Sequence, residues 1–184
     1  MLYIITALKP EAQAFIDRYR LKKKPLSKYK IFTNNSITLI ISAVGVLNAR
    51  EATQTLINHF DITDEDIYLN VGICGASREY KIGELLEVST LVYKEQSYPL
   101  LCSDKKSLYC VDKEATTDEH TIVDMESYGV YDAVIHSPAI KKFHILKVVS
   151  DYFEPHKVTK ERTKMLIFNQ IDAINSIVYK KDKS

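Results

Sequence analysis

The sequence predicts an α/β fold, a three-layer sandwich in which helices flank a mixed, largely parallel central sheet. Segments typical of strands alternate with segments typical of helices, and this order favours a parallel sheet between helical layers. Several strand segments are short, continuous apolar runs, as in strands covered on both faces. The 184 residues, 46% of them hydrophobic, fit one domain that spans residues 1–184.

The first half of the chain opens with an apolar strand segment at residues 2–7, and Pro10 after it suits the first turn of a helix. A polar, lysine-rich connection is expected next, followed by two strands that a turn at Asn34-Asn35 joins. Apolar residues at helical spacing then predict a second helix. The ranges are 10–20 for the first helix, 21–28 for the connection, 29–33 and 37–44 for the strands, and 49–60 for the second helix.

The second half continues the alternation without an internal repeat or a linker rich in Pro, Gly or Ser. A buried strand at 67–71 ends in Gly72-Ile73-Cys74-Gly75, where glycines let the backbone approach a ligand or form a turn. The remaining strands are expected at 85–93, 108–111 and 143–149, and the remaining helices at 125–135 and 159–179.

Charge and hydropathy argue against two classes of partner. The net charge is only +1, and the basic clusters at 22–24 and 180–183 are expected in a solvated loop and at a chain end, which argues against a nucleic-acid binder. No stretch reaches the ~18 apolar residues of a membrane helix. Residues 1–8 lack the features of a signal peptide. We therefore expect a cytoplasmic protein that binds neither nucleic acid nor membrane.

The cysteines and histidines indicate neither a disulfide framework nor a metal site. Cys74, Cys102 and Cys110 are odd in number and form no CxxC pair. The five histidines show no metal-ligand spacing. We interpret Cys74 as a small packing residue, because no histidine that could activate it is implied nearby. No metal and no cofactor are expected.

Three acidic residues stand just past predicted strands or at the start of a helix: Glu11, Glu126 and Asp151. Each has a structural alternative, since acids are favoured in first helical turns and Asp is common in turns and caps. The carboxyl ends of parallel strands meet at one edge of a sheet, where ligands bind. Together the three acids therefore favour a functional site at that edge.

Six short motifs resemble, in the same order along the chain, those of the bacterial methylthioadenosine/S-adenosylhomocysteine nucleosidases of the nucleoside phosphorylase/nucleosidase superfamily. The Met-Glu and Ser-Asp pieces are the most specific, and the glycine turns are weaker. The motifs are Ile4–Glu11, Ser42–Gly45, Asn70–Gly75, Ile82–Leu85, Val123–Ser127 and Val149–Asp151.

The resemblance implies an enzyme that hydrolyses the N-glycosidic bond of an adenosine-type purine nucleoside, which can carry a 5′ modification. It assigns water orientation to Glu11 and proton delivery to purine N7 to Asp151. Glu126 would hold the ribose hydroxyls, and Met125 would pack under the sugar. The resemblance also places Ile73, Cys74, Gly75 and Ser150 among the substrate-binding residues. It further implies a homodimer.

Two alternatives stay open on the sequence. Phosphorylases of the superfamily carry a Gly-Asp-Pro-x-Arg element and a further arginine, and the matching positions here are Thr6–Pro10 and Asn70. Phosphorolysis would need arginines from elsewhere, such as Arg50 or Arg78. A non-catalytic nucleoside-binding homologue is the other alternative. It is suggested by Ile73, which replaces a family serine, and by a short 92–123 region in which 109–114 would replace the segment that edges the base.

Overall fold

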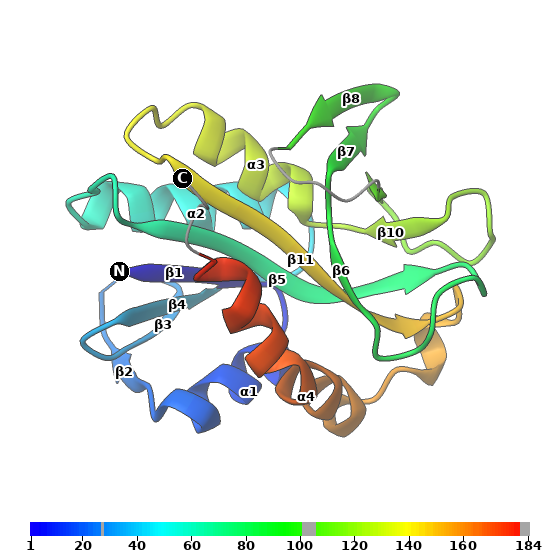
Figure 1. The fold of residues 1–184 in the computed structure, drawn as a ribbon, viewed down its shortest axis with the longest axis horizontal. Coiled ribbons are helices and arrows are strands. Elements are labelled where there is room, and N and C mark those ends of the chain that lie inside the picture. Colours follow the sequence, from blue (N-terminus) through cyan, green and yellow to red (C-terminus); the bar gives the residue numbers. More distant parts are fainter. Residues whose placement is uncertain (27, 101–105, 181–184) are drawn as a thin grey trace.

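The computed structural model describes residues 1–26, 28–100 and 106–180. Within them, eleven strands form one mixed sheet that helices cover on both faces (Figure 1). The strands are β1 Leu2–Thr6, β2 Lys22–Lys24, β3 Lys30–Thr33, β4 Ile37–Ile41, β5 Ile67–Ala76, β6 Leu85–Glu87, β7 Thr90–Tyr93, β8 Gln96–Pro99, β9 Ser107–Cys110, β10 Ile122–Asp124 and β11 Lys142–Asp151. The helices are α1 Lys9–Tyr19, α2 Val46–His59, α3 Ser127–Ile135, α4 Lys160–Val178 and the short 3₁₀ helix η1 Pro155–Lys157.

The centre of the sheet is parallel, as the sequence predicts. Strands β4, β1, β5 and β11 run in the same direction, and β5 and β11 pair over most of their length. The expected turn between β3 and β4 is confirmed: these strands are antiparallel, and the Asn34 side-chain oxygen accepts hydrogen bonds from the main-chain N–H groups of Ser36 and Ile37. The three-layer mixed architecture is therefore confirmed.

Each face of the sheet has its own helical layer (Figure 1). Helices α1 and α4 pack on one face, with Phe15 and Ile171 in the shared core. Helices α2 and α3 cover the other face, where Leu56 and Val130 are fully buried. The crossing of α2 and α3 is close, because a β-carbon at Gly129 would lie 2.0 Å from the carbonyl oxygen of Val46. This crossing fixes α3, and with it the residues at its N-terminus.

Several predicted segments were wrong. The lysine-rich connection contains the strand β2, which pairs with β3 at the edge of the sheet. Lysines on an edge strand keep their charged ends in solvent and oppose pairing with another chain. The stretch Gly72–Gly75 is not a turn, because β5 continues to Ala76. The predicted strand at 85–93 is divided into β6 and β7.

Besides β2, the strands β8 and β10 were not predicted. Strand β10 is only three residues long, and its position between β5 and β9 depends on long-range pairing that local sequence does not reveal. Cys102 and the tail residues 181–183 lie outside the described residues. Within the described part of the chain, no helix has the length and apolar character needed to cross a membrane.

Candidate active site

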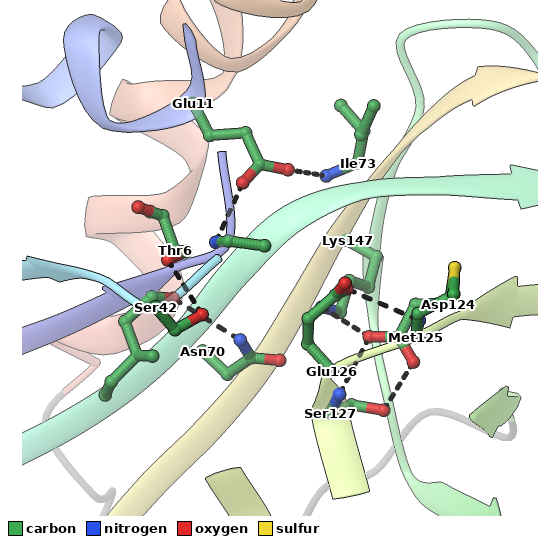
Figure 2. A network of polar contacts seen from close by, with 12 residues as sticks. Thr6, Glu11, Ser42, Asn70, Ile73, Asp124, Met125, Glu126, Ser127 and Lys147 are labelled. Atoms are coloured by element: carbon green, nitrogen blue, oxygen red, sulfur yellow. Dashed lines mark hydrogen bonds and ion pairs between the residues drawn. The ribbon is translucent and has the colours of Figure 1, made fainter. Parts of the chain in front are cut away.

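Glu11 fills a gap in the pairing along one side of β5. The register of β1 ends opposite Asn70, whereas that of β10 begins at Gly75. Between them, the main-chain N–H of Ile73 donates to Glu11 Oε1 at 2.9 Å (Figure 2). The other oxygen of Glu11 accepts from the N–H groups of Ala7 and Leu8 at 3.0 and 2.8 Å. The carboxyl group is thus fixed by three main-chain donors.

Burial raises the pKa of Glu11, while its hydrogen bonds to Ile73, Leu8 and Ala7 and the charge of Lys147 act in the opposite direction. The side chain is only 2% exposed. Its position also explains Gly72, since a β-carbon there would lie 2.8 Å from Glu11 Oε1. The glycine therefore serves close approach of a carboxylate within a strand, not the turn that the sequence suggested.

Glu126 is the N-cap residue of α3 and faces the start of α2. Its Oε1 accepts from the N–H of Gly45 at 3.2 Å, and its Oε2 accepts from the N–H of Met125 at 3.3 Å. Burial raises the pKa of Glu126 to about 7, and the charge of Asp124 adds to this shift. The carboxyl group therefore changes charge near neutral pH.

A buried ion pair lies beside Glu126 (Figure 2). Lys147 Nζ is 2.7 Å from Asp124 Oδ2, and both side chains are almost fully buried. Asp124 also accepts from the Ser127 hydroxyl at 2.6 Å and from the Ser127 main-chain N–H at 3.0 Å. Lys147 was not predicted as a site residue, because a lysine is ordinarily expected to point into solvent. Its location among Val148, Val149 and other buried positions of β11 was the available signal.

Asp151 ends β11 and is held by its neighbours in the chain. Its Oδ1 accepts from the N–H of Glu154 at 2.8 Å, and the hydroxyl of Ser150 lies 2.7 Å from its Oδ2. The same hydroxyl is 3.0 Å from the carbonyl oxygen of Cys74, which links the ends of β11 and β5. A β-carbon at Gly75 would be 3.6 Å from Asp151 Oδ1, so the two residues lie side by side.

All the residues singled out from the sequence line one cavity of about 280 Å³. These residues are Glu11, Ile73, Cys74, Gly75, Met125, Glu126, Ser150 and Asp151. The cavity is also lined by Val111 and Glu114, from the 109–114 segment expected to edge a bound base, and by the adjacent Ala115. Other lining residues that the sequence did not indicate are mainly apolar: Ala7, Leu8, Val44, Val123, Pro155 and Val158. Asp124 contributes a further carboxylate.

The cavity carries several carboxylates, and no Arg, Lys or His stands among the described residues that line it. Arg50 lies elsewhere and forms an ion pair with Asp132 at 2.8 Å. The Arg78 guanidinium is 5.0 Å from the centre of the Tyr152 ring, also outside this cavity. The described residues contain no group of three or more His, Cys, Asp or Glu side chains arranged to hold a metal ion. The site can therefore donate and accept protons and bind hydroxyl groups.

No family model matches the sequence, and no curated protein matches it by sequence comparison. Solved structures do match. The Helicobacter pylori 5′-methylthioadenosine/S-adenosylhomocysteine nucleosidase bound to butyl-thio-DADMe-Immucillin-A superposes with a TM-score of 0.77 at 15% identity, over 96% of this chain and 97% of that chain. The Arabidopsis thaliana 5′-methylthioadenosine nucleosidase gives 0.74 at 16% identity, over 95% of each chain.

A third match is the Colwellia psychrerythraea 5′-methylthioadenosine/S-adenosylhomocysteine nucleosidase in complex with adenine. It has a TM-score of 0.72 at 17% identity, over 93% of this chain and 94% of that chain. In all three comparisons nearly the whole of both chains is superposed, although few residues are identical. The chain therefore has the fold of the 5′-methylthioadenosine/S-adenosylhomocysteine nucleosidases.

Proposed function

We propose that this protein hydrolyses the N-glycosidic bond of an adenosine-type purine nucleoside and releases the free base. The observation that carries the proposal is the convergence of Glu11, Glu126 and Asp151 on one cavity. These acids come from α1, the N-terminus of α3 and the end of β11. Structures of the same fold bind adenine and an immucillin, which supports a nucleoside-sized ligand in this cavity.

Asp151 is the proposed general acid. A purine leaves poorly as an anion, so protonation at N7 lowers the barrier, and such general-acid help contributes about 10²–10⁴-fold in rate. The neighbouring Ser150 hydroxyl and the N–H of Glu154 hold the carboxyl group in place. Gly75 lies beside this carboxyl group, and a β-carbon there would come within 3.2 Å of Val123 and 3.6 Å of Asp151 Oδ1, so the glycine keeps a side chain from crowding the acid.

Glu126 is the proposed ribose ligand. An ionised carboxylate accepts hydrogen bonds from two neighbouring sugar hydroxyls, and its negative charge stabilises the oxocarbenium-like sugar of the transition state. The main-chain N–H groups of Gly45 and Met125 fix the carboxylate. Met125 lines the same cavity and supplies an apolar surface under the sugar ring.

Glu11 is the proposed ligand of the attacking water. As the C–N bond breaks, a water oxygen bonds to C1′ and gives one proton to the Glu11 carboxylate, while Asp151 gives its proton to N7 of the departing base. The products are therefore ribose and neutral base. Binding of phosphate as the nucleophile would need cationic side chains, and the described residues that line the cavity include no Arg or Lys. This supports hydrolysis over phosphorolysis.

The test is release of free base from a panel of purine nucleosides, followed by chromatography with and without added phosphate. We expect adenine from adenosine-type substrates at a rate that phosphate does not change. Asp151→Asn should lose about 10²-fold or more in kcat. The matched control is Asp172→Asn, because Asp172 is an exposed acid on α4 that pairs with Arg18 at the surface. No base release from any nucleoside would refute the proposal.

The same panel separates the alternatives. A rate that rises with phosphate would indicate a phosphorylase. Calorimetry that shows nucleoside binding without turnover would indicate a binding protein. We also propose a homodimer, since two apolar side chains close in sequence are exposed: Val44, which lines the cavity, at 43%, and Leu47, in the first turn of α2, at 72%. Light scattering after size-exclusion chromatography tests this.

A further inference from the structure

The ammonium group of Lys147 is buried together with three carboxylates. Its side chain projects from β11 toward Asp124, beside Glu126 (Figure 2). Against the effect of its burial, the charges of Asp124, Glu126 and Glu11 all raise the pKa of Lys147. With every group ionised, one positive charge would stand against three negative ones. A buried charge is costly unless it is paired. How the single positive charge is shared among the three acids therefore decides which of them binds a proton.

Lys147 forms its ion pair with Asp124. The ion pair is 2.7 Å long, and Asp124 is held in place by the hydroxyl and the main-chain N–H of Ser127. The hydrogen bonds of Glu126 come instead from the main-chain N–H groups of Gly45 and Met125. The ion-pair partner of Lys147 is thus Asp124, whereas the carboxylate that faces the sugar in the proposed function is held by main-chain donors.

We infer that Asp124 is a positioning residue that holds the Lys147 ammonium and offsets its charge, and so sets the pH range in which Glu126 binds ribose. The inference rests on the proposed function, because it concerns the ionised form of Glu126 as ribose ligand. Asp124 acts through Lys147 and Glu126 and takes no part in bond breaking.

The charged and titratable groups around Lys147 support this role. Asp124 comes from β10, Glu126 from the N-cap of α3 and Glu11 from α1. The charge of Lys147 also acts on the thiols of Cys74 on β5 and Cys110 on β9. Burial raises the pKa of both thiols, so they stay neutral.

Among the charges acting on Glu126, that of Asp124 raises its pKa the most, and that of Lys147 lowers it. The two members of the ion pair therefore act on Glu126 in opposite directions. Removing one member should move the ionisation of Glu126 one way, and removing the other member should move it the other way.

The experiment measures kcat/KM for adenosine hydrolysis by the full-length protein as a function of pH. The acid limb of this profile is expected to follow the ionisation of Glu126. Asp124→Asn should shift this limb to lower pH by about one unit, the lower end of the effect of a unit charge at 4–6 Å. Lys147→Gln should shift it to higher pH. Asp124→Glu, which keeps the charge, should keep the wild-type limb, and so should the surface control Asp172→Asn.

A role confined to folding would lower activity or the melting temperature without moving the limb. The two variants act in opposite directions, so a folded sample of either one decides. Limbs that coincide with the wild-type limb overturn the inference and leave the proposed function intact, because wild-type base release establishes that function separately. Absence of base release in the wild type refutes the proposed function instead.

Discussion

Replacement of Gly72 by alanine would place a methyl group against the carboxylate of Glu11. The new β-carbon would lie 2.8 Å from Oε1, whereas ordinary van der Waals contact begins at 3.4 Å, so the carboxylate must move by about 0.6 Å. The three main-chain donors that hold Glu11 cannot follow, because two come from the β1–α1 connection and one from β5 itself. The hydrogen bond from Ile73 is the one that lengthens.

Loss of one hydrogen bond to a charged group costs about 1.5–3 kcal/mol. Misplacement of a group that orients the nucleophile by about 1 Å can cost 10²-fold in rate. We therefore expect Gly72→Ala to reduce kcat/KM for base release by about 10- to 100-fold, with a protein that still folds. The assay is initial-rate release of adenine, together with thermal unfolding followed by circular dichroism.

The double variant with Glu11→Gln provides the control. If alanine at position 72 acts through the carboxylate, the double variant should be no slower than Glu11→Gln alone, because both changes remove the same contact. A folded Gly72→Ala protein with wild-type kcat/KM would refute the reasoning. Losses that simply multiply in the double variant would show that Gly72 acts through another part of the strand.

Three further outcomes are expected. Gly129→Ala would place a β-carbon 2.0 Å from the carbonyl oxygen of Val46 and should lower the free energy of unfolding by about 3 kcal/mol, measured in urea. Cys74 and Cys110 should resist iodoacetamide at pH 8 in the folded protein and react after unfolding, because burial raises the pKa of both thiols; peptide mass spectrometry measures this. Burial raises the pKa of Glu126 from 4.5 to about 7, so the folded protein binds a proton that the unfolded chain releases between those values. The stability contributed by this group therefore falls as pH rises through that window, and urea unfolding at pH 5 and pH 8 should show a smaller difference for Glu126→Gln than for the wild type.

The sequence was sufficient to predict the alternating architecture and the edge of the sheet where the acids meet. Glu11 and Asp151 follow apolar strands, and the parallel order brings the ends of such strands together. Local pattern was insufficient where pairing partners decide the structure. The Gly72–Gly75 stretch suggested a turn, yet it stays extended because β11 pairs with all of it, with a register shift just before Gly75.

The buried ion pair next to the cavity also could not be predicted from local sequence pattern. Lys147 occupies a buried strand position that usually belongs to an apolar residue, and its partner Asp124 is on a strand too short to predict. Only the tertiary arrangement shows that the two charges compensate each other. The edge strand β2 is a similar case, because three consecutive lysines oppose β-propensity and are tolerated only where their side chains reach solvent.

The gap in strand pairing beside residues 71–74 has a consequence for divergence of the sequence. Glu11 takes the place of a missing neighbouring strand for the Ile73 amide, so a descendant that lost the reaction would still need an acceptor at that position. An acid or amide at position 11 is therefore a poor marker of activity among distant homologues. The aspartate at position 151, whose contacts come from its immediate neighbours in the chain, is the more informative residue to compare.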